Sequence, residues 1–149
     1  MPQAAEYRYS VNSWCVPRNT SLQDIEQAAR IGAGAIGLWE GKFREGEDEA
    51  IANALARYNL RAGIVMPHHW TILPTPLDPD GMAYDWRTKS QGICGSIKRL
   101  ARFKPVGIMV GPGVSGNPAE RLGPVEHVIE GLKMIADQSV GSNTPDGES

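Results

Sequence analysis

Residues 32–40 read GAGAIGLWE, and three glycines, Gly32, Gly34 and Gly37, have the spacing of a dinucleotide-binding loop. In a dinucleotide-binding unit this loop follows a strand and opens a helix, so that backbone N–H groups meet the pyrophosphate. Here the order is reversed, because a helical pattern precedes the glycines and an apolar, strand-like run follows them. The glycines therefore predict a helix C-cap and a tight turn into a strand rather than a nucleotide site.

The helix that leads into this turn has its own start signal. We expect it to begin at Thr20 or Ser21, with Gln23 or Asp24 completing a capping box, and to end before Gly32. The helical spacing predicts a buried stripe made of Leu22, Ile25, Ala28 and Ala29.

Outward from this stretch, short strand patterns alternate with longer helical patterns four times. Strands are predicted at residues 7–14, 34–40, 61–67 and 105–110. Helices are predicted over residues 20–32, 47–60, 85–103 and 117–136. Strands joined by single helices lie parallel with right-handed crossovers. The sequence thus predicts an α/β fold, a (βα)4 parallel sheet within residues 1–140, followed by a disordered polar tail at 141–149.

The patterns also predict which side chains face inward. In the later helices these are Ile51, Leu55, Tyr58, Ile93, Ile97, Leu100, Ala101, Val125, Val128, Ile129, Leu132 and Ala136. The strand at 105–110 is fully apolar, which predicts that it is covered on both faces.

A second glycine loop, GPGVSG at residues 111–116, has the better order of strand before helix. Its helix, however, is expected to begin only at Asn117–Pro118, with Glu120 as the capping-box acid, and Pro112 removes a backbone donor from the loop. No strand-ending acidic residue follows about 20 residues later. These features argue against dinucleotide binding and leave open a contact with a polar ligand or a plain turn.

Charge and cysteine content exclude several classes of protein. The formal net charge is −2, and the densest basic run, IKRLARFK at 97–104, is typical of a helix with a solvated basic face, so we expect no nucleic-acid partner. The sequence has no apolar run long enough to cross a membrane, and its first residues lack the apolar segment of a signal peptide. We therefore expect a cytoplasmic protein without a membrane contact. Cys15 and Cys94 do not form a C-x-x-C motif, so neither a disulfide framework nor a structural zinc is expected.

The chemistry of a parallel α/β fold gathers at the carboxyl ends of its strands. Those ends are predicted at 12–15, 39–42, 67–70 and 111–116. Glu40 directly follows an apolar strand, so its carboxylate could accept a sugar hydroxyl or act as an acid or base. The alternative is a rim residue that pairs with Lys42 or Arg44.

Histidines and tryptophans supply the other candidates. His68 and His69 are adjacent on a chain expected to be extended, so they should point opposite ways and at most one should face a common site. A tryptophan near a strand end could pack on the C–H patches of a sugar or fill the core. We therefore take Glu40 and His68 as catalytic candidates and name no metal ligand. The candidate substrate-binding residues are Asn12, Trp14, His69, Trp70 and Gly111.

Two quoted segments carry a family resemblance. YSVNSWCVPRNTSLQDIEQAARIGAGAIGLWEGKF (9–43) and LRAGIVMPHHW (60–70) resemble the amino-terminal half of the xylose isomerase-like TIM-barrel superfamily, which contains sugar phosphate isomerases, epimerases and abasic-site endonucleases. The resemblance covers about residues 7 to 138. It implies a TIM-barrel half and a sugar or sugar phosphate as the ligand.

The resemblance further implies one divalent metal held by Glu, Asp, His and Glu side chains of later strands, which this chain does not contain. That ion would polarise a carbonyl and a hydroxyl while two glutamates move a proton through an enediolate. A half-barrel would expose an apolar inner face and would need a homodimer or a complementary half-barrel to cover it. The alternatives are a smaller flavodoxin-like sheet, a non-catalytic α/β module that binds a polar ligand, and an endonuclease, which the acidic balance disfavours.

Overall fold

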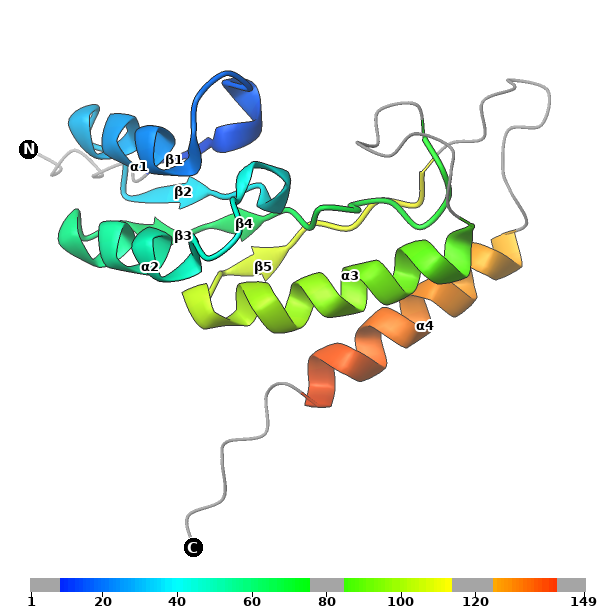
Figure 1. The fold of residues 1–149 in the computed structure, drawn as a ribbon. Helices are drawn as coiled ribbons and strands as arrows, with labels where there is room; N and C mark the ends of the chain where they lie inside the picture. Colours follow the sequence, from blue (N-terminus) through cyan, green and yellow to red (C-terminus); the bar gives the residue numbers. More distant parts are fainter. Residues whose placement is uncertain (1–8, 76–84, 114–124, 142–149) are drawn as a thin grey trace, which may run out of the picture. The chain divides into compact units, whose positions relative to one another are not determined.

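The structure, a computed structural model, describes residues 9–75, 85–113 and 125–141 (Figure 1). The predictions for Asn117–Pro118, Glu120, residues 114–116 of the second glycine loop and most of the tail lie outside these residues. The chain divides into two compact units. One is Met1–Val65 with Phe103–Gly107, and the other is Met66–Arg102 with Ile108–Ser149.

The first unit contains the parallel sheet. Strands β1 (Ser10–Asn12), β2 (Ala35–Gly37) and β3 (Arg61–Ala62) pair in the order β1-β2-β3, and β4 (Ile64–Val65) pairs with β5 (Gly107–Ile108). A flavodoxin-like sheet would place the first strand between the second and the third. The observed sequential order is instead that of a barrel wall, and the predicted (βα)4 half-barrel class is confirmed.

The sheet is curled toward one face. The predicted strand at 61–67 is interrupted at Gly63, whose N–H donates to the Ile36 carbonyl over 2.8 Å. A β-carbon at Gly63 would lie 2.9 Å from Ser10 Oγ, although β1 and β3 are not neighbours in the sheet. Flat strands two positions apart are about 10 Å from each other, so this approach indicates a concave face.

Helices α1 (Ser21–Arg30) and α2 (Asp48–Arg57) pack against each other. Because successive right-handed crossovers step in one direction through β1-β2-β3, both helices cover the same face of the sheet. The core of this unit is made of Ile25, Ala28, Ile36, Leu38, Ile51, Leu55, Leu60, Ala62 and Val65.

The turn into β2 forms as predicted. The side chain of Thr20 accepts a hydrogen bond from Gln23 N, and Gln23 Oε1 accepts one from Thr20 N, which completes the capping box. After the C-cap at Ile31, Gly32 has φ = +75°, a conformation that favours glycine. The first glycine motif therefore ends a helix, as expected from the order of the elements.

The second unit is built on two long helices, α3 (Trp86–Leu100) and α4 (Val125–Gly141), which lie side by side (Figure 1). Thr71 and Gly111 form a parallel bridge beside them. The core contains Ile72, Leu73, Trp86, Ile93, Ile97 and Ile135. A β-carbon at Gly131 would lie 2.7 Å from both Ile72 Cγ2 and Ser90 Oγ, so glycine lets α4 approach closely.

Several inward predictions are wrong. The side chains that the structure exposes instead are Leu22, Tyr58, Ala101, Val125, Ile129, Leu132 and Ala136. In α4 the helix face that packs inward is the one with Gly131 and Ile135, and Val128 is partly buried there, because Gly131 allows the close approach. The predicted apolar stripe is therefore turned toward the surface. The strand at 105–110 is not covered on both faces, since Val106 is 71% exposed.

A groove of about 980 Å³ lies over the first-unit sheet and reaches the amino-terminal end of its strands, since Ala29 of α1, the turn at residues 32–34 and Tyr58 also line it. Its strand residues include the small Ser10, Gly37 and Gly63 together with the apolar Ile64 and Val106. The strand residues that line this groove are small as well as apolar, so the groove is less apolar than the predicted inner face of a half-barrel.

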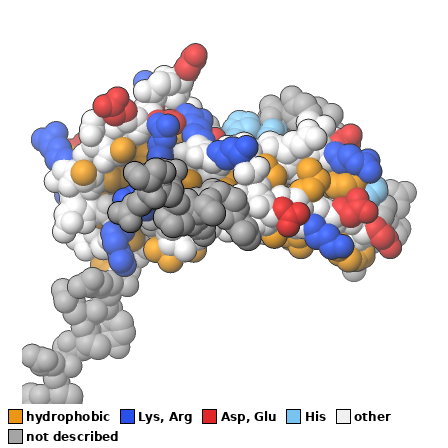
Figure 2. Space-filling model, turned by 90° about the horizontal axis from the view of Figure 1, so that it is seen from below, with side chains coloured by type: hydrophobic (Ala, Val, Ile, Leu, Met, Phe, Trp, Pro, Cys, Tyr) orange, Lys and Arg blue, Asp and Glu red, His pale blue; other side chains and the backbone are white. Residues whose placement is uncertain are grey.

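The surface carries charges of both signs. On the face drawn in Figure 2, Lys and Arg side chains are interspersed with Asp and Glu. Within the described ranges, no helix is long and apolar enough to cross a membrane.

Candidate functional site

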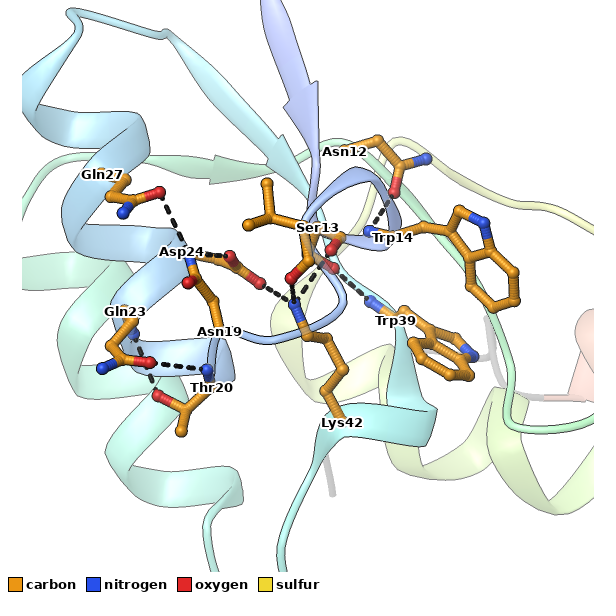
Figure 3. A network of polar contacts seen from close by, with 11 residues as sticks. Asn12, Ser13, Trp14, Asn19, Thr20, Gln23, Asp24, Gln27, Trp39 and Lys42 are labelled. Carbon is orange, nitrogen blue, oxygen red and sulfur yellow. Dashed lines mark hydrogen bonds and ion pairs between the residues drawn. The ribbon is translucent and has the colours of Figure 1, made fainter. Parts of the chain in front are cut away.

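Two short turns follow neighbouring strands of the first unit and lie at the carboxyl ends of these strands (Figure 3). We call this region the strand-end edge. After β1 comes the 3-10 helix η1 (Ser13–Cys15), and after β2 comes η2 (Glu40–Lys42). Asn12 caps η1, because its Oδ1 accepts a hydrogen bond from Trp14 N over 2.9 Å. The cap occupies the side-chain oxygen of this candidate residue and leaves its amide nitrogen as the group that can donate to a ligand.

Two tryptophans meet at this edge. The rings of Trp14 and Trp39 lie edge to face with centroids 4.4 Å apart, and Ser13 Oγ accepts a hydrogen bond from Trp39 N over 3.0 Å. A β-carbon at Gly41 would overlap Cζ2 and Cε2 of Trp39, so the indole lies directly on the glycine backbone. The aromatic pair is therefore held by packing from both turns.

A buried ion pair connects the same two turns to α1. The Lys42 ammonium donates to the Asp24 carboxylate, to Ser13 O over 2.9 Å and to Val16 O over 2.8 Å (Figure 3). The Lys42 and Asp24 side chains are only 5% and 4% exposed. Asn19 Nδ2 donates to the other Asp24 oxygen over 3.0 Å. This network fixes the strand-end edge against the helix.

Glu40 begins η2 and is 8% exposed. An ammonium has three N–H donors, and the contacts above occupy all three on Lys42. Both interpretations of Glu40, a ligand-binding or acid–base carboxylate and a rim residue paired with Lys42 or Arg44, stay predictions. A carboxylate enclosed in a rigid strand-end turn has the fixed position that a general base requires.

In the second unit the two histidines do not point opposite ways. The segment bends at His68 and His69, and their rings lie edge to face with centroids 4.9 Å apart. The expectation was wrong because it assumed an extended chain. A β-carbon at Gly92 of α3 would lie 3.0 Å from His69 Cδ2, so this helix glycine makes room for the imidazole.

Trp70 and Gly111 also lie together in this unit. Gly111 N donates to Trp70 O over 2.7 Å, and a β-carbon at Gly111 would lie 3.6 Å from Trp70 Cζ3. Trp86, by contrast, belongs to the core: it is 7% exposed, stacked on His127 at 4.9 Å, and Arg87 lies 4.4 Å from its ring centroid.

The candidate residues thus form two local sets. Asn12, Trp14 and Glu40 belong to the first unit. His68, His69, Trp70 and Gly111 belong to the second. Across residues 9–75, 85–113 and 125–141, no three His, Cys, Asp or Glu side chains come together as a possible metal site.

Three charged residues of these units were not foreseen. Asp24 and Lys42 form the buried pair, and Lys89 of α3 is 1% exposed, with burial lowering its pKa to about 8. The burial of Asp24 could have been predicted from the sequence, because Asp24 has the helical spacing of the buried residues Ser21, Ile25 and Ala28. Lys42 was considered only as a partner of Glu40, and no pattern marked Lys89.

No protein-family model and no curated protein matches this chain. Among solved structures it is similar to the apo form of the 3-keto-D-glucoside 4-epimerase YcjR from E. coli, with a TM-score of 0.65 and 12% identity. The match covers 93% of this chain and 54% of that chain, so this chain spans about half the length of that protein. The likeness shows the shared fold.

Proposed function

We propose that this chain is the amino-terminal half-barrel of a sugar isomerase or epimerase of the xylose isomerase-like superfamily. Its ligand would be a sugar or sugar phosphate bound at the carboxyl ends of β1 and β2. The observation that carries the proposal is the rigid edge made of Trp14, Trp39 and the enclosed Glu40. The sequence resemblance and the similar fold of a sugar epimerase support the same class.

Each residue of this edge has a role in the proposal. Trp14 packs on the apolar C–H patch of a sugar ring, and the Asn12 amide donates to a hydroxyl. Glu40 accepts a proton from a hydroxyl or from a carbon next to a carbonyl. His68, which belongs to the second unit, is a separate candidate for proton transfer.

The superfamily resemblance implies a divalent ion bound by residues of later strands. The described residues contain no group of three suitable ligands, so the site they form does not fit such an ion. We therefore assign to this chain only binding, orientation and proton transfer at Glu40 and His68.

Binding is tested with a panel of hexoses, hexose phosphates and a 3-keto-D-glucoside, using tryptophan fluorescence and ligand-observed NMR. We expect saturable binding that Trp14→Ala removes. Tyr58→Ala is the matched control, because this exposed aromatic residue follows α2 at the opposite, amino-terminal end of the strands. The proposal is wrong if no sugar binds or if the two variants behave alike.

Proton transfer is tested separately by following solvent deuterium exchange at the carbon beside the carbonyl of any keto sugar that binds. We expect exchange that Glu40→Gln abolishes while sugar affinity remains. Binding without exchange in the parent chain would contradict the catalytic part and favour the non-catalytic polar-ligand module.

A further inference from the structure

We propose that Ser13 is a positioning residue of the strand-end edge. It sets the geometry of the Trp14–Trp39 pair and thereby determines how tightly a sugar binds there. The effect on the two indole rings follows from contacts within the first unit. The effect on sugar affinity rests on the proposed function, so the two effects are measured separately.

Ser13 is bonded to the neighbouring turn through both of its acceptor oxygens. Its Oγ accepts a hydrogen bond from Trp39 N over 3.0 Å, and its carbonyl oxygen accepts one from Lys42 Nζ over 2.9 Å (Figure 3). Ser13 is only 3% exposed, so water has little access to these contacts. Because Trp14 is the next residue along the chain, the bonds that hold Ser13 to η2 also bring the two tryptophans together.

The indole of Trp39 has no polar anchor of its own among the described residues. Its Nε1 is buried and makes no hydrogen bond to any of them. The ring is located instead by packing, on the backbone of Gly41 and against the ring of Trp14, and by the backbone N–H of Trp39. That N–H donates to the Ser13 hydroxyl, so this hydroxyl sets where the indole begins.

Sugar binding depends on where the two ring faces lie. The rings form a corner, with centroids 4.4 Å apart and an interplanar angle of 67°, so a sugar that packs on Trp14 lies close to Trp39. Dispersion contacts weaken steeply with distance, and a gap of roughly 0.5–1 Å already forfeits a quarter to a half of the attraction. A small displacement of Trp39 therefore costs affinity.

Removing the Ser13 hydroxyl causes such a displacement. Ser13→Ala leaves the Trp39 N–H without its acceptor, and an unsatisfied backbone donor is costly, so the end of β2 must move until this N–H reaches another partner. The Ser13 carbonyl oxygen stays bound to Lys42, so η1 keeps its place. The change is thus confined to one side of the aromatic pair.

The first test measures the aromatic pair without a ligand. Two indoles in contact couple their electronic transitions, and the resulting couplet in the circular dichroism spectrum depends on the distance and angle between the rings. Trp14→Phe identifies the part of the spectrum that belongs to the pair. We expect Ser13→Ala to lose most of this couplet while its amide NMR spectrum remains that of a folded chain.

Ser21→Ala is the control for this test. Ser21 belongs to the same unit and is 1% exposed, and its hydroxyl makes no hydrogen bond to any described residue. The control removes the same atom from an equally enclosed site and should leave the couplet unchanged. An unchanged couplet in Ser13→Ala would overturn the proposal, as would equal losses in both serine variants or a parent spectrum that Trp14→Phe does not alter.

Gly41→Ala displaces the same indole from another side while the Ser13 hydroxyl remains. Gly41 does not have a positive φ, so alanine suits its backbone. The added β-carbon would lie 2.3 Å from Trp39 Cζ2, so the ring has to move, and the couplet should fall as in Ser13→Ala. An unchanged couplet here would contradict the geometry on which the proposal depends.

The second test measures sugar affinity in the same variants by ligand-observed NMR, with the panel of hexoses, hexose phosphates and a 3-keto-D-glucoside. The dissociation constant should rise about 10-fold in Ser13→Ala and keep its parent value in Ser21→Ala. A lost couplet with unchanged affinity would overturn the role of Ser13 in binding. If the parent binds no sugar, the proposed function and the affinity effect fail together, whereas the couplet still decides whether Ser13 positions the pair.

Discussion

At the scale of single residues, the strand-end edge depends on charges that are fully enclosed. The ammonium of Lys42 satisfies two backbone carbonyls and one carboxylate, and thereby holds η1 and η2 to α1. An enclosed pair of this kind adds little net stability compared with apolar residues, but losing one partner leaves a buried charge. Its contribution is therefore to fix the geometry of the edge.

Lys42→Met should destabilise the chain by about 3–5 kcal/mol, because the Asp24 carboxylate would lose its ion partner while remaining buried. Urea unfolding measures the change. Arg30→Met is the matched control, since it breaks the exposed i,i+4 pair with Glu26 and should cost no more than ~0.5 kcal/mol. Equal effects would show that the Asp24–Lys42 pair is not enclosed in solution.

Lys89 predicts a pH dependence. Its pKa falls from 10.5 in the unfolded chain to about 8 in the fold, because burial disfavours the ammonium. Between these values the unfolded chain binds more protons, so the contribution of this group to stability rises with pH; below about 8 both states are protonated and it is constant. From pH 8 to 10.5 the free energy of unfolding of the parent should therefore increase relative to that of Lys89→Met. A constant difference over this range would refute the shift.

At the scale of elements, the ends of α1 are determined by local hydrogen bonds. The capping box of Thr20 and Gln23 starts the helix, and the positive φ of Gly32 ends it at the turn into β2. Because each of these contacts spans only a few residues, the local sequence is enough to specify where the helix begins and ends.

Thr20→Ala should cost about 1 kcal/mol, because Gln23 N loses its side-chain acceptor. Ser21→Ala, one residue later, is the control. The Ser21 hydroxyl is buried and makes no hydrogen bond to any described residue, so its removal should be neutral or slightly stabilising. Thermal unfolding of both variants measures the contrast, and a costlier Ser21→Ala would contradict the assignment of the cap.

At the scale of the whole molecule, the curl of the sheet distinguishes a barrel wall from an open layer. The observation that shows this curl is the close approach of Ser10 on β1 to Gly63, although β2 lies between them in the sheet. An open, weakly curled sheet would keep these positions too far apart to interact.

Gly63→Ala should destabilise by ~1–3 kcal/mol, since its β-carbon would lie 2.9 Å from Ser10 Oγ. Ser10→Ala removes that oxygen and should recover ~0.5 kcal/mol or more in the double variant. A double-mutant cycle in urea gives the coupling energy. Strictly additive effects would mean that β1 and β3 do not approach each other in solution.

The sequence by itself determined the order of the elements, the caps of α1 and the structural role of the first glycine motif. It also placed Asn12, Trp14 and Glu40 at the ends of neighbouring strands. These features depend on local hydrogen bonds, hydrophobic period and the handedness of crossovers, all of which act over short stretches of chain.

The tertiary structure alone decided which side of α4 is buried, the bend that brings His68 and His69 together, and the burial of Lys89. The pairing of Asp24 with Lys42 joins residues 18 positions apart through a turn whose path no local pattern specifies. Rotation of α4 likewise follows from the contact of Gly131 with Ile72, 59 positions earlier in the chain. Such contacts depend on how separate elements pack, and a periodic pattern defines an apolar face only to within the neighbouring positions of the helix.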